Sequence, residues 1–380
     1  MYFGIIGHHE GIHLHALSYL HISGLITYKK HIVFFNTDHP ERLAHCAALI
    51  KWWYLTDDAG LSEAVQDTSI VGVPSNDLGK ELKKRFDSIK RYKVVELLHT
   101  DKEIKESGKE IFSFGQQWRW VITGYQDISL YEIIDFDKPC HGMEVGMMPA
   151  KLALSLINIA VGEYEEVISH KWEVLSWDTK KWKEKELMTY NSTLKTPPTV
   201  WDPFVWFGTT SFLSHRLGYP SIASDANITN IKNNLARREK TKTTLVGAEN
   251  TKIPLTIRKH DVTKPFGDPT FGYADCIVSE GYLGRVVTHR THMSAIRDAA
   301  DEVLALYKSF CTNLTTLAES KPKARVLVMT IPAWIHHDYD IADRVEEAFR
   351  DAWWECTLIH DIYARKWQTV GRQVLIAIRK

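Results

Sequence analysis

Four acidic side chains stand at the ends of apolar runs in the second half of this chain. Asp202, Asp225, Asp261 and Glu280 each follow their own predicted strand. In an open α/β sheet the ligand lies beyond the carboxyl ends of the strands, and an acid after the second strand accepts hydrogen bonds from a ribose diol. The pattern therefore predicts a ligand site at one sheet edge. The alternative for Asp225 and Asp261 is that each only caps the segment that follows it.

The first of these acids opens a turn that contains glycine. This turn runs from Asp202 to Thr210 and reads DPFVWFGTT. Glycine in the first strand-to-helix turn lets the backbone approach a ligand closely. A glycine turn alone is weak evidence, but its order with the later acids is specific.

The elements that must position these residues alternate regularly from residue 198 onward. The predicted strands are 199–204, 221–225, 253–261, 275–280 and 325–332. Helices are predicted between them, the longest over 294–318, and this alternation is typical of a doubly wound parallel sheet. A helix over 342–354 follows, and the last two apolar runs read as a hairpin added to the sheet. The fold class is therefore α/β, a Rossmann-like domain with a C-terminal β-hairpin.

The first 140 residues read as a separate α+β region. Strand-like runs such as YFGIIG and HIVFFNT alternate with helical candidates over 14–20 and 40–55. The turn-rich connector DFDKPCHG predicts a boundary near residue 140, which gives domains over 1–140 and 141–380. Within the second domain we expect a helix over 147–162 and a charged insertion over 163–195.

Composition restricts the partners only weakly. The chain has 380 residues, with 47 Lys and Arg against 47 Asp and Glu, so net charge neither favours nor excludes nucleic acid. Its five cysteines form no CxxC pair, and the histidines near the N-terminus lack cysteine or carboxylate partners, so no metal site is expected. No apolar run approaches the roughly 20 residues that cross a bilayer, and we expect a cytoplasmic protein without a membrane partner.

Several motifs together resemble one enzyme family. DPFxxxGTT followed by SDxN resembles the DPFCGxGT and Gly-Ser-Asp-Ile motifs of the methyltransferases that modify N2 of guanosine at tRNA position ten. GMMPAKLA at 146–153 is similar to the GMLPPKLAQ helix of that family, and the segments 125–127, 135–139 and 363–372 are similar too. The resemblance implies a ferredoxin-like and THUMP-like RNA-binding region, followed by a class I methyltransferase domain that uses S-adenosylmethionine.

The resemblance also implies roles for individual residues. In the family the DPF turn and its glycine hold the methionine part of the cofactor, the acid after the second strand holds the ribose, and the acid after the third lies near the adenine. Residue by residue these cofactor roles fall on Asp202, Pro203, Phe204, Gly208, Thr209, Asp225 and Asp261.

The step after the fourth strand departs from the pattern expected of amino-methyltransferases. Such enzymes use an (Asp/Asn)-Pro-Pro-(Tyr/Phe) step, whose polar groups accept the amine protons while the ring stacks on the extruded base. Here the step reads EGYLG, with a longer acid, no proline and the aromatic residue one place early. We expect Glu280 to accept from the target amine and Tyr282 to stack. The alternative is an acid and a ring without catalytic duty.

These observations predict an S-adenosylmethionine-dependent methyltransferase that acts on an exocyclic amine of a nucleic-acid base, with guanosine N2 in tRNA as the preferred acceptor. The alternatives are a DNA amino-methyltransferase and a non-catalytic RNA-binding relic. Two groups of basic side chains could bind phosphate or simply form a solvated face. One lies on a predicted helix and the other follows a helix of the cofactor domain: Lys80, Lys83, Lys84, Arg85, Lys90, Arg91 and Lys93, and Arg237, Arg238, Lys240 and Lys242.

Tryptophan is unusually frequent, with 13 in the chain. Trp206 replaces the first glycine of the family's cofactor turn, and Trp53 and Trp367 also stand where related sequences tend to have glycine. One cause that would explain all three is a UGA codon that the source lineage reads as glycine. The rival explanation is that Trp206 is genuine and obstructs the ligand site.

Overall fold

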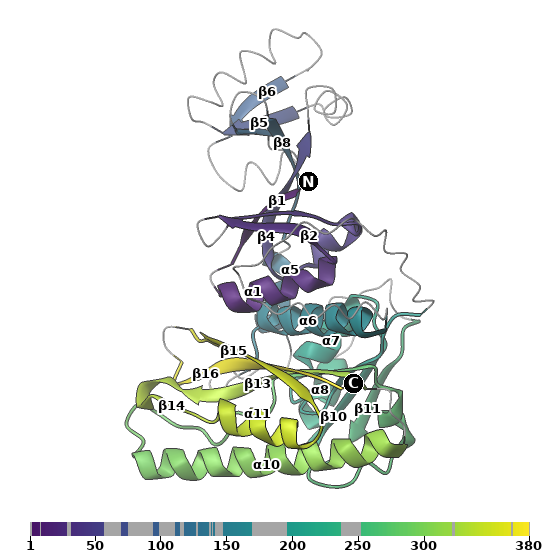
Figure 1. Cartoon of the computed structure of the whole chain (residues 1–380), viewed down its shortest axis with the longest axis vertical. Helices are drawn as coiled ribbons and strands as arrows, with labels where there is room; N and C mark the ends of the chain where they lie inside the picture. The colour runs from purple at the N-terminus through teal and green to yellow at the C-terminus, as the bar shows by residue number, and fades with distance from the viewer. Residues whose placement is uncertain are drawn as a thin grey trace. The chain divides into compact units, whose positions relative to one another are not determined.

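The described part of the chain contains three β-sheets (Figure 1). The structure is a computed structural model, and it describes residues 2–7, 9–28, 32–56, 70–74, 94–98, 111–114, 118–126, 128–136, 138, 140, 147–168, 196–236, 252–320, 324–365 and 368–379. Among these, residues 2–10 and 20–126 belong to one compact unit, and residues 11–19 and those from 128 onward belong to a second.

The second unit is built on an eight-stranded sheet. Its strands are β9 (Val200–Asp202), β10 (Ser221–Asp225), β11 (Leu255–Lys259), β12 (Cys276–Ser279), β13 (Val326–Trp334), β14 (Tyr339–Asp340), β15 (Glu355–Tyr363) and β16 (Val370–Ile378). They lie in the order β11-β10-β9-β12-β13-β16-β15, with β14 paired to β13. The first five strands of this order are parallel, and β16 is antiparallel to both of its neighbours. The predicted Rossmann-like sheet and its C-terminal hairpin are confirmed.

Burial explains why these runs form strands. Every residue of β9, β12 and β13 is buried, which is what a parallel strand covered on both faces requires. The edge strand β15 instead alternates between more exposed and less exposed positions. An aromatic group fills the core beside β9, where Trp201 packs against Phe271 with ring centroids 4.9 Å apart and donates from Nε1 to Ser224 Oγ at 2.9 Å.

Helices cover both faces of this sheet. Figure 1 shows α6 (Ala150–Ile168) and α7 (Thr209–Arg216) on one face, and α10 (Met293–Ser320) and α11 (Ala342–Asp351) on the other. The short helix α8 (Thr229–Ala236) follows β10. In α11 the buried residues Ala342, Val345 and Phe349 recur at helical spacing, which fixes the face that packs on the sheet.

The charged insertion was predicted to begin at residue 163, which lies inside helix α6. Helix α6 runs through Ile168, because its buried positions continue at Glu165 and Val167 beyond residue 163. The rest of that segment, 169–195, lies outside the described residues.

The first unit contains a six-stranded antiparallel sheet. Its strands are β1 (Tyr2–Ile6), β2 (Ser23–Tyr28), β3 (Ile32–Asn36), β4 (Leu49–Thr56), β7 (Ile111–Phe114) and β8 (Trp118–Tyr125), in the order β2-β3-β1-β4-β8-β7. Strands β5 (Ile70–Pro74) and β6 (Val94–Leu98) form a separate parallel pair. Helix α1 (Glu10–Ala16) and the 3₁₀ turn over 17–20 follow β1. The ferredoxin-like and THUMP-like character of this region stays a prediction.

One predicted helix is wrong. Residues 40–55 form a 3₁₀ turn over Pro40–His45 and then strand β4. The run LIKWWYLT is rich in aromatic and aliphatic residues that suit a strand, and it pairs with β1 on one side and β8 on the other. A short apolar run does not by itself distinguish a buried strand from a helix.

The segment just before the predicted boundary at residue 140 has bonds within the second unit. Asp135, in helix α5 (Ile128–Phe136), accepts a hydrogen bond from the first N–H of α6, Ala150 N, at 2.8 Å. Lys138 Nζ donates to Thr209 Oγ1 at the start of α7, at 2.6 Å. Apart from residues 11–19, the described second unit accordingly begins at Ile128. A functional division into domains 1–140 and 141–380 stays a prediction.

Candidate cofactor site

The turns after β9 and β12 face each other at the point where the strand order reverses. From β9 the chain adds β10 and β11 on one side and then returns to place β12 on the other. Such a switch point leaves a crevice at the carboxyl ends of the two central strands, where open α/β sheets bind their ligands. The predicted residues at these ends are Asp202 on β9 and Glu280 directly after β12.

Asp202 ties the two turns together. Its side chain is buried, and Oδ1 accepts from Ser279 Oγ at 2.7 Å and from Phe204 N at 3.1 Å. Ser279 Oγ in turn accepts from Gly281 N at 3.1 Å. Burial raises the pKa of Asp202 to about 7, and the nearby charge of Asp225 also raises it. At neutral pH the carboxyl is therefore close to its midpoint of protonation.

This raised pKa predicts a pH-dependent stability that Asp202→Asn removes. The folded chain binds the proton more tightly than the unfolded chain, whose ordinary value is 3.8. The contribution is full below pH 4 and is lost as pH rises through about 7, on the order of 4 kcal/mol. We expect urea unfolding to show stability falling between pH 4 and 7 relative to Asp202→Asn, whose neutral amide still accepts from Ser279. Parallel pH profiles for the two proteins would contradict this.

The glycine of the first turn is required by its backbone. Gly208 has φ +90° and precedes α7, and its N–H donates to Val205 O at 2.6 Å. A Cβ at this position would lie 2.6 Å from the Phe212 ring. Both observations require glycine at this position, and the predicted role of Gly208 in holding the methionine part of the cofactor stays a prediction.

Asp225, at the end of β10, accepts a hydrogen bond from the turn that follows β9. Its Oδ2 accepts from Trp206 N at 3.1 Å and its Oδ1 accepts from Asn227 N at 2.9 Å. Burial raises the pKa of Asp225, while these N–H donors lower it. The backbone N–H of Ala226 also lowers the pKa of Asp225. A carboxylate offers about four acceptor positions, so at least one remains for a ribose hydroxyl beyond these three donors.

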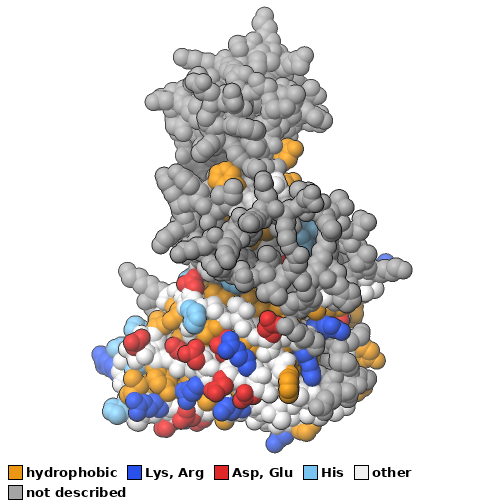
Figure 2. Space-filling model, viewed as in Figure 1, with side chains coloured by type: hydrophobic (Ala, Val, Ile, Leu, Met, Phe, Trp, Pro, Cys, Tyr) orange, Lys and Arg blue, Asp and Glu red, His pale blue; other side chains and the backbone are white. Residues whose placement is uncertain are grey.

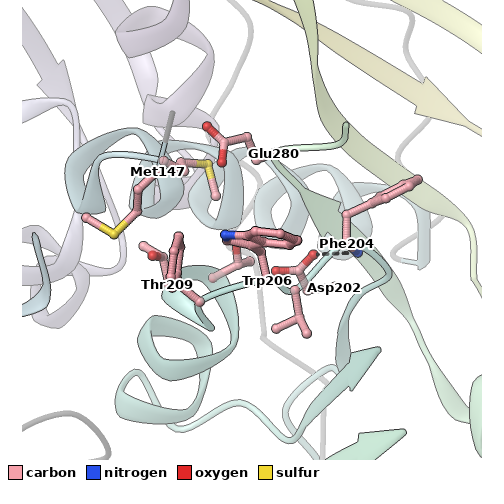
Figure 3. A pocket seen from close by; sticks show the side chains of 10 residues that line it. Met147, Asp202, Phe204, Trp206, Thr209 and Glu280 are labelled. Atoms are coloured by element: carbon pink, nitrogen blue, oxygen red, sulfur yellow. Dashed lines mark hydrogen bonds between the residues drawn. The ribbon is translucent and has the colours of Figure 1, made fainter. Parts of the chain in front are cut away.

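A cleft of about 250 Å³ opens between these turns and the start of α6. Its lining combines residues from three segments: Met147, Met148, Asp202, Phe204, Val205, Trp206, Phe207, Thr209, Thr210 and Glu280. In Figure 3 the indole of Trp206 stands in the middle of these side chains, with Thr209 on one side and Asp202 on the other. This volume includes space that is open to solvent. Trp206 narrows the cleft at its centre.

Glu280 is held by a buried arginine. Arg372, on β16, donates from Nε at 2.7 Å and from Nη2 at 2.6 Å, both to Glu280 Oε1. Arg372 is fully buried, whereas the Glu280 side chain keeps 17% of its surface exposed. Burial raises the pKa of Glu280 and Arg372 lowers it. The carboxylate that we predicted to accept from a target amine thus already carries two hydrogen bonds on one oxygen.

Five predicted site residues are not among those that line the cleft: Pro203, Gly208, Asp225, Asp261 and Tyr282. Tyr282 is partly exposed, and its carbonyl accepts from Tyr307 Oη at 2.9 Å. Asp261 follows β11 in an exposed loop, where Oδ1 accepts from Thr263 N at 2.9 Å and from Thr263 Oγ1 at 2.7 Å. These bonds within its own turn lower the pKa of Asp261. The capping alternative describes the contacts of Asp261 in this structure.

Lys138 is a site residue to which the sequence assigned no role, although it lies in the segment 135–139 that resembles the enzyme family. Its side chain is buried and donates to Thr209, which lines the cleft. Burial lowers the pKa of Lys138 to about 8, and Asp135 and Glu280 act in the opposite direction. A lysine in a turn-rich connector carries no pattern of its own, and only the fold brings it to Thr209.

The described residues include neither a metal-binding group nor a membrane-spanning helix. Among the described residues, no group of three or more His, Cys, Asp or Glu side chains is placed to hold a metal ion. The helices within the described ranges include none whose length and apolarity would allow it to span a bilayer.

Comparisons with known proteins give a likeness of fold at low similarity. No protein-family model and no curated protein matches the chain. A solved structure of magnesium protoporphyrin IX methyltransferase from Synechocystis PCC 6803 with bound SAM is 11% identical, covering 62% of this chain and 88% of that chain with a TM-score of 0.33. A METTL16 methyltransferase domain is 11% identical, covering 66% of this chain and 94% of that chain with a TM-score of 0.39. A SAM-dependent methyltransferase from Methanosarcina mazei is also 11% identical, covering 49% of this chain and 94% of that chain with a TM-score of 0.34. Such values establish no shared activity, and the Rossmann-like topology is established by the strand order itself.

Proposed function

We propose that the second unit binds S-adenosylmethionine and transfers its methyl group. The observation that carries this proposal is the Asp225 carboxylate, which accepts from Trp206 N in the glycine turn after β9 and keeps an acceptor position for a ribose hydroxyl. Its place beyond the second strand, next to the switch point between β9 and β12, is where a ribose lies in nucleotide-binding α/β sheets.

The cofactor roles follow the turns. The methionine part is assigned to the turn formed by Asp202, Pro203, Phe204, Gly208 and Thr209. The ribose is assigned to Asp225, and the adenine to the neighbourhood of Asp261 in the loop after β11. The buried lysine behind Thr209 fixes the start of α7, whose first N–H groups face the same turn.

The chemistry demands alignment more than acid-base machinery. When bound, the cofactor would supply an electrophilic methyl group to an amine nitrogen, its carbon–sulfur electron pair would stay on sulfur, and the proton released from the nitrogen would pass to water. Glu280 presents a negative charge at the cleft, where the amine becomes positive. The Arg372 guanidinium holds that charge in place, and Tyr282 supplies a ring on which an extruded base can stack.

We further propose a nucleic-acid base as the acceptor, with guanosine N2 in tRNA preferred. The support is the family resemblance in the cofactor turn and in residues 146–153. On the face of the second unit seen in Figure 2, basic and acidic side chains are interspersed rather than gathered by sign. Ion pairs such as Arg344–Asp301 and Arg350–Glu346 account for part of this mixture. The basic runs over 80–93 and 237–242, which lie outside the described residues, remain the proposed phosphate contacts.

Transfer of a labelled methyl group from S-adenosylmethionine tests this function. The chain and its Trp206→Gly variant are incubated with bulk tRNA and, separately, with single-stranded DNA. We expect label in tRNA, on N2-methylguanosine after nuclease digestion, and more of it with the variant because its cleft is wider. Label in DNA alone would favour the DNA amino-methyltransferase. Cofactor binding without methyl transfer to either nucleic acid would favour the non-catalytic RNA-binding relic.

A further inference from the structure

Two tryptophans occupy a backbone conformation that suits glycine. Trp206 has φ +39° and Trp353 has φ +67°. In this left-handed region the Cβ of an L-residue crowds the following carbonyl oxygen, which strains residues other than glycine. Asp and Asn tolerate the region through local hydrogen bonds, but a bulky aromatic residue there is an outlier.

Trp353 stands at the position that most often requires glycine at a helix end. Helix α11 ends with Trp353 N donating to Arg350 O at 3.0 Å and Trp354 N donating to Phe349 O at 3.1 Å. These two bonds form a Schellman motif, in which the left-handed residue after the C-cap is usually glycine. The Trp353 side chain is 83% exposed, so burial of the indole does not compensate the strain.

Trp206 shows the same combination inside the cofactor turn. Its side chain is 44% exposed, and it lines the cleft that it narrows. The contact that the turn needs from this residue is its backbone N–H, which donates to Asp225 Oδ2. Glycine supplies that N–H equally well, adopts the conformation without strain and leaves the cleft open.

Other tryptophans of the second unit differ in both respects. Trp201, Trp334 and Trp354 are at most 4% exposed, and none has a positive φ. Trp201 also donates a hydrogen bond to Ser224. These three are ordinary core residues, which separates them from Trp206 and Trp353 by burial and by backbone conformation together.

We infer that the organism encoding this chain has glycine at positions 206 and 353. Both are UGA codons that its translation reads as glycine, and the tryptophans come from a code in which UGA means tryptophan. The backbone identifies Trp353, which resemblance did not indicate. It does not identify Trp53, whose residue lies in the extended strand β4, and Trp367 lies outside the described residues. The consequence for the cleft rests on the proposed function, whereas the codon assignment does not.

The gene and the native protein test the inference directly. We expect UGA at codons 206 and 353, UGG at codons 201, 334 and 354, and glycine at both positions in peptides sequenced by mass spectrometry from the source cells. UGG at either of codons 206 and 353, or tryptophan in either native peptide, would overturn the inference.

Melting of recombinant variants tests the physical argument separately. Trp353→Gly should raise the melting temperature by about 2–4 °C, because it removes the left-handed strain at an exposed position. Trp353→Ala removes the same indole but keeps a Cβ, and it should recover much less. Trp354→Gly, the neighbouring control, should lower the melting temperature because it empties a buried site. If Trp353→Gly melts no higher than Trp353→Ala, glycine is not what the position requires. These results do not depend on cofactor binding, so failure of the proposed function would leave them intact.

Discussion

Arg372→Met is expected to destabilise the second unit by about 3–5 kcal/mol at pH 7.5. The arginine is fully buried and gives two hydrogen bonds to Glu280 Oε1. Methionine keeps much of the side-chain volume, so the main loss is the partner of a mostly buried carboxylate. Urea unfolding followed by circular dichroism measures the change. We expect part of the loss to disappear as pH falls, because protonation of Glu280 removes the unpaired charge.

Two controls separate this ion pair from an ordinary one. Arg350→Met removes an exposed arginine that bonds to Glu346 one helical turn away, and it should cost less than about 1 kcal/mol. The double variant Arg372→Met with Glu280→Gln should be more stable than Arg372→Met alone, because no charge is left unpaired. Equal losses for Arg372→Met and Arg350→Met would contradict the role assigned to the buried pair.

Asp225→Ala is expected to weaken binding of S-adenosylhomocysteine by about 10- to 150-fold. Hydrogen bonds to a charged group contribute roughly 1.5–3 kcal/mol, and the carboxylate is the acceptor assigned to the ribose. The comparison belongs in the Trp206→Gly background, where the cleft is open. Asp301→Ala is the matched control: this exposed aspartate pairs with Arg344 and has no assigned cofactor role, and we expect a loss of less than fivefold, about 1 kcal/mol. Equal losses of affinity in the two variants would contradict the assignment of the ribose to Asp225.

The sequence predicted the central sheet well because its strands are buried on both faces. Runs such as CIVS and VLVMT are continuous and apolar, and turn residues bound them, so their type and order can be read directly. The run over 49–56 is just as apolar, but its pairing with β1 and β8 decides its structure. No local pattern reports such pairing.

From the sequence, site residues could be predicted only where they lie in the turns that follow strands. Asp202 and Asp225 were identified because each stands at a strand end, and Gly208 because it lies in the turn after the first strand; the structure connects them through that turn. The pair Glu280–Arg372 was not, because its members lie 92 positions apart and meet only when β16 joins the sheet. For the same reason the sequence assigned Lys138 no role in the site. The left-handed backbone at Trp353 was also hidden, since the sequence predicted that the helix continues through it.

Titration of S-adenosylhomocysteine into the Trp206→Gly variant, followed by calorimetry, tests the central claim most directly. The account predicts saturable binding with one site per chain, at least about tenfold tighter than in the chain with Trp206 and weakened by Asp225→Ala. No binding by a folded Trp206→Gly variant would contradict the assignment of this cleft to S-adenosylmethionine.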